Sequence, residues 1–321
     1  MSNTNIIDVF TRHFGPTTPR YVTRAPGRVN LIGEHTDYNG LPAFPMTLQR
    51  GIEVYFAPRD DHTVQLANTD PRFATATFEV SGDIAPDAPG AWPNYAKAAA
   101  QALARRHGAL QGMDAVITSD LPIAAGLSSS SALTVACVLS LLRSNDLEMA
   151  PLELMALVAK GERYVGTHGG GMDQAICIGG RANTALKIDF APLRLTPTTI
   201  PRHWHFVVAS SMVRAEKSGA ARDTYNRRVD ECGEAIDAVV QNLKEAAGVA
   251  GYPELLARCD PETLLQAADN ILSDPIRKRF RHVVTEAGRV EAAREAMLGA
   301  DAKTFGALMC DSHASLRDDY E

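Results

Sequence analysis

Three polar segments of the chain carry residue types that could do chemistry. The first, residues 24–40, reads RAPGRVNLIGEHTDYNG. An apolar run in it ends at Gly33, and four polar residues follow it: Glu34, His35, Thr36 and Asp37. Clustered carboxylates with mixed donors suit a ligand that has several hydroxyl groups, such as a sugar. An ordinary hydrophilic loop has the same composition, so the residues alone leave both interpretations open. A metal site is disfavoured, because His35 and Asp37 have no third ligand at metal spacing.

The second segment, residues 122–133, reads PIAAGLSSSSAL. A predicted strand ends just before it, and a predicted helix begins among the serines. The N–H groups and the dipole of a helix N-terminus bind anions, and serine hydroxyls add donors to phosphate and one possible Mg²⁺ ligand. No Lys follows, so this is not a Walker loop. A serine-capped buried helix is the alternative, but four consecutive serines exceed what capping needs, which favours phosphate binding.

The third segment, residues 169–174, reads GGGMDQ. Glycines allow a backbone to approach a ligand closely, and the carboxylate of Asp173 could then be aimed into a cleft. This pattern is weak evidence by itself, because Asp beside Gly is common in turns.

The elements that must position these segments follow from the apolar pattern. Strands are predicted at residues 21–32, 51–57, 63–68, 73–80, 113–119, 185–190 and 205–209. Helices are predicted at residues 92–107, 129–142, 151–165, 225–247, 261–268 and 274–298. A Pro-rich stretch at 191–201 is interpreted as a linker. The sequence therefore predicts an α+β protein of two domains, residues 1–195 and 196–321, the first built on a mixed sheet.

Composition bounds the function class. The chain has 321 residues, a net charge of −6, 45% hydrophobic and 22% charged residues, which is typical of a soluble globular protein and gives no support for nucleic-acid binding. Its five cysteines are odd in number and contain no C-x-x-C, which argues against a disulfide framework or a zinc ribbon. We expect no signal peptide and no membrane span, and hence a reduced, cytoplasmic protein.

In order and spacing the three segments resemble those of galactokinases, members of the GHMP superfamily of small-molecule kinases. Residues 25–39 resemble the family signature APGRVNLIGEHTDYN, residues 122–130 the phosphate loop P-x-x-x-G-L-S-S-S, and residues 170–174 the catalytic G-x-M-D-Q. Residues 281–286 and 312–321 also read like galactokinase segments. The resemblance implies the two-domain GHMP kinase fold, with a ferredoxin-like α+β C-terminal domain. It also implies ATP-dependent phosphorylation of the anomeric hydroxyl of galactose to galactose 1-phosphate, the first step of the Leloir pathway.

The resemblance also implies a role for each matching residue. Asp173 would be the catalytic base, with Arg28 beside it to keep the carboxylate ionised and to stabilise the transferring phosphoryl group. The sugar hydroxyls would be held by Glu34, His35, Thr36 and Asp37, with Tyr225 closing the pocket. The phosphates of ATP would be bound by Ala124, Ala125, Gly126, Leu127, Ser128, Ser129 and Ser130. Mg²⁺ would be held by Ser130 and Glu162.

The chain departs from the family pattern in two respects. Relatives often have Cys in place of Gly169 and a bulkier aliphatic residue in place of Gly171. We therefore expect a more flexible loop before Asp173, which leaves the hexose selectivity open. The chain also stops at Glu321, where a galactokinase would continue through a third, Gly-rich motif and further strands. The C-terminal domain is therefore expected to be incomplete, with an unpaired sheet edge and exposed apolar surface.

Two other functions compete with galactose phosphorylation. One is a GHMP kinase for a related sugar, such as N-acetylgalactosamine, arabinose or a uronic acid. The other is a catalytically silent galactose sensor, against which the presence of Arg28, Asp173, Glu162 and the serine loop argues. Galactose and ATP are the expected partners, with no nucleic acid and no membrane, and the expected state is a monomer or weak homodimer.

Overall fold

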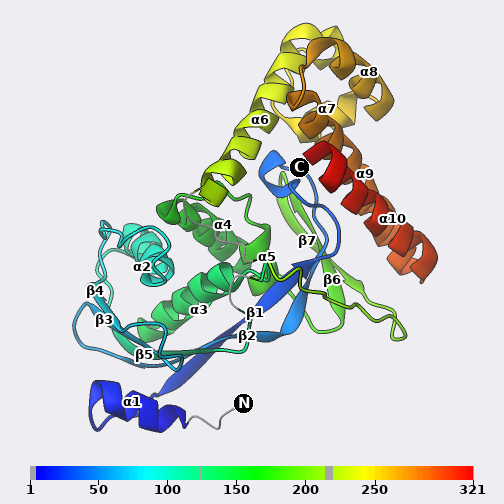
Figure 1. The fold of residues 1–321 in the computed structure, drawn as a ribbon. Helices are drawn as coiled ribbons and strands as arrows, with labels where there is room; N and C mark the ends of the chain where they lie inside the picture. The colour runs from blue at the N-terminus through cyan, green and yellow to red at the C-terminus, as the bar shows by residue number, and fades with distance from the viewer. Residues whose placement is uncertain (1–4, 123–124, 214–219, 321) are drawn as a thin grey trace.

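A mixed seven-stranded sheet lies at the centre of the N-terminal part of the molecule, with a helical lobe beyond one end of it (Figure 1). The computed structural model describes residues 5–122, 125–213 and 220–320. The strands are β1 (Tyr21–Asn30), β2 (Pro45–Pro58), β3 (Thr63–Asn68), β4 (Ala76–Glu79), β5 (Met113–Ser119), β6 (Thr184–Phe190) and β7 (Leu193–Thr199).

Strand β2 organises the sheet. The strand order is β4-β3-β5-β2-β6-β7, with β1 also paired to β2. Residues 52–58 of β2 pair antiparallel with β5, and its first residues pair with the end of β1 and, at Met46, with β6. The sheet is mixed because β3 and β5 run parallel, whereas the other pairs are antiparallel. Strand β2, which is 14 residues long, therefore joins the two halves of the sheet.

The helices fall into two groups. Around the sheet lie α1 (Ile6–Phe14), α2 (Pro93–His107), α3 (Ser129–Ser144), α4 (Pro151–Gly161) and α5 (Met172–Gly179). The helical lobe contains α6 (Ala220–Asn242), α7 (Tyr252–Arg258), α8 (Pro261–Ile271), α9 (Ile276–Leu298) and α10 (Ala302–Ser315), followed by a π-helical turn, Leu316–Tyr320. Figure 1 shows α2 to α5 on one face of the sheet and α1 on the other.

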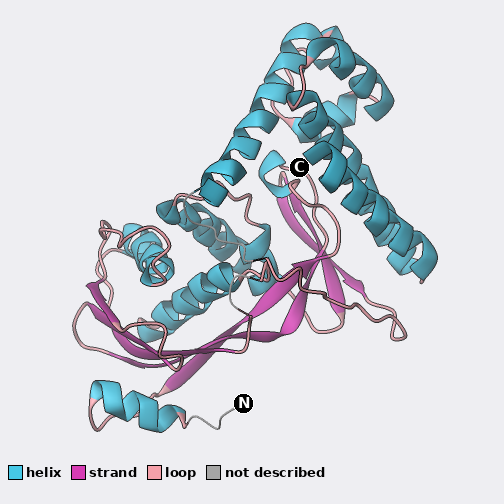
Figure 2. Ribbon diagram, in the orientation of Figure 1, coloured by secondary structure: helices cyan, strands magenta, loops and turns pink. Residues whose placement is uncertain are grey.

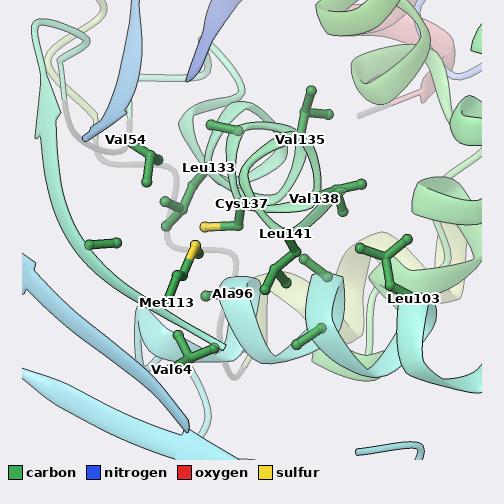
Figure 3. Packing of buried hydrophobic residues seen from close by; sticks show 14 of the residues in the cluster. Val54, Val64, Ala96, Leu103, Met113, Leu133, Val135, Cys137, Val138 and Leu141 are labelled. Carbon is green, nitrogen blue, oxygen red and sulfur yellow. The ribbon is translucent and has the colours of Figure 1, made fainter. Parts of the chain in front are cut away.

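The largest hydrophobic core lies between the sheet and helices α2 and α3 (Figure 3). Small residues of α2, such as Ala96, Ala99 and Ala100, allow close packing against α3, whose Val135, Val138 and Leu141 are buried. This packing fixes α3. It therefore also fixes the serine-rich loop (residues 125–131), from which α3 begins.

The prediction of a linker at residues 191–201 was wrong. Residues 193–199 form β7, which pairs with β6 along its whole length. Pro197 is accommodated because β7 is the last strand of the sheet, and a proline that lacks a backbone donor is tolerated at such an edge. The predicted domain division after residue 195 would pass through this strand, and it stays a prediction.

The predicted strand at residues 205–209 was also wrong. These residues have no regular structure, and Val207 is 90% exposed. A strand needs a neighbour to pair its backbone groups, and among the described residues none lies beside this segment. Across the described residues from 200 onward, all regular structure is helical (Figure 2), so the predicted ferredoxin-like sheet is not part of what the structure describes. Of the helices in the described ranges, none has the length and apolarity needed to cross a membrane.

Two leucines test the core directly. Leu141 on α3 is 1% exposed, whereas Leu152 on α4 is 47% exposed. We expect Leu141→Ala to lower the free energy of unfolding by about 2–5 kcal/mol, because it leaves a cavity in a close-packed core. Leu152→Ala should change it by less than about 0.5 kcal/mol. Urea denaturation of the two variants measures both values, and equal losses would contradict the assignment of the core.

Candidate active site

The serine-rich loop leads into α3 and is tied to β1 by one arginine. Ser128 precedes the helix with a left-handed backbone, φ 55°, and the N–H groups of the first helical turn have no acceptor within the helix. The Arg28 guanidinium donates to the carbonyl oxygen of Gly126 at 2.7 Å, and the Arg28 N–H donates to that of Leu127 at 3.3 Å. Ala125 and Gly126 are exposed. Ala124 lies outside the described residues.

Asp173 lies in the first turn of α5, directly after the three glycines. Its Oδ1 accepts a hydrogen bond from Arg28 Nε at 2.6 Å, and its Oδ2 accepts one from the Ser128 hydroxyl. Burial lowers the pKa of Arg28, but the neighbouring carboxylate more than offsets this and the pKa is raised. The side chains of Arg28 and Asp173 are 13% and 14% exposed, so the pair is sheltered without being sealed.

The polar loop, residues 33–40, follows the buried residues Leu31 and Ile32 after β1. Gly33 has φ +94°, and a Cβ there would lie 2.8 Å from Ala43 Cα, so only glycine fits. Thr36 is fully buried, and its Oγ1 lies 2.8 Å from the carbonyl oxygens of Gly33 and Pro42. The Thr36 side chain is therefore engaged with the loop's own backbone. Burial raises the pKa of Glu34, against the opposing charge of Arg28.

The glycine triplet packs directly on the polar loop. Asp37 Oδ2 accepts a hydrogen bond from the N–H of Met172 at 3.3 Å. A Cβ on Gly170 would overlap the backbone of Asp37 and Tyr38, so this close approach requires glycine. Asp37 and Asp173 consequently lie near each other, and burial together with the Asp173 charge raises the pKa of Asp37 to about 6.

Aromatic rings surround His35. Its ring stacks on that of Tyr320 with centroids 4.2 Å apart, and its Nδ1 lies 3.0 Å from the Tyr38 hydroxyl. The Tyr225 ring centroid is 6.0 Å from that of His35. Burial and the nearby His282 lower the pKa of His35 to about 3, so the imidazole is neutral at ordinary pH.

Glu162 and the serines of α3 provide oxygen atoms beside the loop. Ser131, the last of the four consecutive serines, donates to Glu162 Oε1 at 3.2 Å. Ser130 lies next to it and is partly exposed. Carboxylate and hydroxyl oxygens are suited to Mg²⁺. Within the described residues no three His, Cys, Asp or Glu side chains form a metal cluster, so an ion here would need phosphate and water oxygens as well.

All the residues that the sequence singled out and that the structure describes lie around one site. Tyr320 was missed as part of it. Tyr320 lies within the segment 312–321 that was noted for its resemblance, but nothing in the sequence signalled its contact with His35.

Two family models match the chain. Residues 8–58 match the galactokinase galactose-binding signature, and residues 94–181 match the GHMP kinases N terminal domain. A galactokinase of Roseiflexus sp. (strain RS-1) is 39% identical over 319 residues, which are 97% of this chain and 76% of the relative. This chain belongs to the galactokinase family. A galactokinase of Chloroflexus aggregans is also 39% identical, over 98% of this chain and 77% of the relative.

Solved structures agree with the family assignment. The Lactococcus lactis galactokinase complexed with galactose matches with a TM-score of 0.82 and 28% identity, over 98% of this galactokinase-family chain and 79% of that structure. The Methanococcus jannaschii mevalonate kinase matches with a TM-score of 0.54 and 15% identity, over 95% of this chain and 80% of that one. The latter likeness shows the GHMP kinase fold alone.

Gly170 tests the packing between the triplet and the polar loop. We expect Gly170→Ala to force the two loops apart and to reduce the affinity for the sugar ligand by about tenfold or more, because a Cβ has no room there. Gly306→Ala is the control, since a Cβ at that helical position meets nothing within 4 Å. Calorimetric titration with galactose measures both, and an unchanged affinity in Gly170→Ala would contradict the observed packing.

Proposed function

We propose that this chain transfers the γ-phosphoryl group of ATP to the anomeric hydroxyl of galactose. The observation that carries the proposal is the position of the Asp173 carboxylate. It lies between Arg28 of β1 and Ser128 of the serine-rich loop, on the helix whose preceding glycines pack on the polar loop. Membership of the galactokinase family and the likeness to a galactokinase crystallised with galactose support this choice of substrate.

Asp173 acts as the base. The anomeric oxygen of the sugar forms a bond to the γ-phosphorus, the bond from that phosphorus to the β–γ bridging oxygen breaks, and ADP leaves. The proton of the anomeric hydroxyl passes to the Asp173 carboxylate. Phosphoryl transfer depends mainly on positioning and electrostatics, and the base contributes about 10²- to 10⁴-fold.

Arg28 has two functions in this proposal. Its Nε holds the Asp173 carboxylate, and its second contact, to the Gly126 carbonyl, fixes the guanidinium beside the serine-rich loop. The positive charge therefore lies close to the place where negative charge develops on the transferring group. The N–H groups of residues 125–130 and the N-terminus of α3 hold the phosphates of ATP.

Ser130, Ser131 and Glu162 are the residues that would hold Mg²⁺. The ion, when bound, neutralises charge on the β- and γ-phosphates. The oxygen-only donor set of these residues fits this ion, and their small number leaves positions for phosphate oxygens and water.

The polar loop binds the sugar. Glu34 and Asp37 accept hydrogen bonds from sugar hydroxyls, and neutral His35 and Tyr225 complete the pocket. Thr36 shapes the loop from inside. Asp37 ionises within the working pH range, because its pKa is raised to about 6.

An ADP-release assay with Mg-ATP and a panel of sugars tests the proposed reaction. We expect turnover on galactose, and a loss of about 10²- to 10⁴-fold in kcat for Asp173→Ala. Asp60→Asn, at an exposed position, is the control and should leave kcat unchanged. Galactose binding without ADP release would indicate a galactose sensor and contradict the proposed kinase activity. Faster turnover on N-acetylgalactosamine, arabinose or a uronic acid would reassign the substrate.

The pH dependence of galactose binding tests Asp37. A carboxyl with a pKa of about 6 is ionised above that pH and protonated below it, so acceptor capacity is lost as the pH falls. We expect the Kd for galactose, measured without ATP, to be flat above pH 7 and to rise by up to about tenfold for each pH unit below the pKa. Asp37→Asn should bind weakly with no such rise between pH 5 and 7. An equally steep rise in Asp37→Asn would exclude Asp37 as its source.

A further inference from the structure

The polar loop holds an unfavourable backbone conformation. Gly33 has φ +94°, and His35, which has a side chain, has φ +61°. A non-glycine residue in the left-handed region costs about 1–2 kcal/mol. Glu34 lies between these two residues, so the direction of its side chain depends on whatever holds this backbone in place.

Helix α9 contacts the backbone on both sides of Glu34. The N–H of Gly33 donates to Glu286 Oε1 at 2.8 Å, and the N–H of Glu34 approaches the same oxygen at 3.4 Å. The carbonyl oxygen of Glu34 accepts from His282 Nε2 at 3.0 Å. Because His282 and Glu286 are four residues apart on a helix, they lie on one face, one turn apart.

Helix α10 in turn fixes these two side chains. Ser312 of α10 donates to Glu286 Oε1 at 2.6 Å, and Arg289, on α9 itself, donates from Nε to Glu286 Oε2 at 2.7 Å. His282 Nδ1 lies 3.0 Å from the Ser315 hydroxyl. Ser312 and Ser315 are three residues apart, so they too share one helical face.

The chemistry of the contacts defines the state of His282. A carbonyl oxygen only accepts hydrogen bonds, so Nε2 carries a proton. Burial lowers the pKa of His282, which favours the neutral ring with Nδ1 as the acceptor from Ser315. The Ser315 hydroxyl also lies 3.0 Å from Asp319 Oδ2 and can donate to one of the two at a time.

Both α9 side chains are fully buried, with 0% exposure. Burying a carboxylate costs several kcal/mol of desolvation, and its hydrogen bonds do no more than offset that cost. A protein with well-packed apolar residues at the same position is often as stable or more stable. Stability of the helical lobe alone therefore does not require Glu286. Its four hydrogen bonds, two of them to the polar loop, indicate a role in placing that loop.

We propose that His282 and Glu286 are positioning residues that clamp the backbone around Glu34 and thereby set the affinity of the site for its sugar. The choice of sugar as the ligand rests on the proposed function, whereas the hydrogen bonds that hold the loop backbone do not depend on it. Neither side chain is bonded to Arg28, Asp173 or the serine-rich loop in the contacts described above, so the clamp acts on the sugar and leaves the nucleotide site unchanged.

The test compares two substitutions at His282 with a control on the same helix. His282→Leu removes the donor to Glu34, whereas the side-chain amide of His282→Gln can restore it. Val283→Ala leaves a cavity in the core of the helical lobe at a residue that is 0% exposed, and so it destabilises the lobe without removing a hydrogen bond to the loop backbone. KM for galactose, KM for ATP, Tm and hydrogen exchange of residues 31–39 are measured for each variant.

We expect His282→Leu to raise KM for galactose by about tenfold to a hundredfold, with KM for ATP within about twofold of the parent chain. His282→Gln should recover most of the loss, and Val283→Ala should lower Tm with KM for galactose unchanged. An equal rise of both KM values, or a rise of KM for galactose in Val283→Ala as large as in His282→Leu, would overturn the clamp.

Hydrogen exchange gives a readout that does not require activity, and it is measured in two variants. Gly33 and Glu34 amides should exchange faster in His282→Leu and in Glu286→Gln, in which Arg289 faces an amide and the carboxylate is lost. Unchanged exchange in both would overturn the proposal even if His282→Leu were poorly folded. If the parent chain fails to phosphorylate galactose, the proposed function is wrong, and the exchange data still decide the clamp.

Discussion

The ion pair between Arg28 and Asp173 is the interaction on which the site depends. It joins β1 to α5 across 145 positions of sequence, and the same guanidinium binds the Gly126 carbonyl of the serine-rich loop. Three segments that are distant in the chain thus meet at one planar group. Arginine suits this task because its fork of donors has fixed geometry and keeps its charge when partly buried. Lysine would supply the charge without the second fixed contact.

Close backbone approach is the second constraint. The polar loop and the glycine triplet touch through Gly170, where any side chain would overlap Asp37 and Tyr38. The triplet also borders Glu162, since a Cβ on Gly169 would lie 2.9 Å from Glu162 Oε2. The sheet and α3 give the site its frame, but these glycines set how near the polar loop and Glu162 can come to the start of α5. Their role is therefore to admit neighbours, and flexibility need not be invoked for Gly170.

The sequence predicted the elements whose signals are local. Strands β1, β3 and β5 and helices α2 and α3 were found at nearly their observed bounds, because alternating or helical apolar spacing reports burial directly. Strand β7 was missed because Pro197 and the prolines on either side of the strand suggest a linker until its edge position is known. Residues 205–209 have the composition of a strand, but a strand also requires a partner, which composition does not report. Helix α5 was hidden by the glycines that precede it.

The site divides in the same way. The motif residues Arg28, Asp37 and Asp173 lie around one centre in the structure, and each motif is a continuous run of sequence, whereas the roles of these residues stay predictions. Tyr320, whose hydroxyl bonds that of Tyr38 across 282 positions, and the α9 residues that hold the loop backbone lie in the segments 312–321 and 281–286, which the resemblance marked without giving any residue a role. Contacts of this kind depend on how helices pack, and no periodicity or spacing in a single chain encodes them.

Electrostatic cost links these observations. Glu34, Asp37, Asp173 and Glu286 are four carboxyl groups gathered in one region, and the pKa of Asp37 is raised by burial and by the charge of Asp173. Such a cluster opposes folding unless donors face each oxygen. Arg28 and Ser128 supply donors to Asp173, Ser312 and the Gly33 N–H supply them to Glu286, and the Met172 N–H supplies one to Asp37. The donors that make the cluster tolerable also fix the directions of the Asp37, Asp173 and Glu286 carboxylates, so the hydrogen bonds that folding requires are the ones that orient these groups.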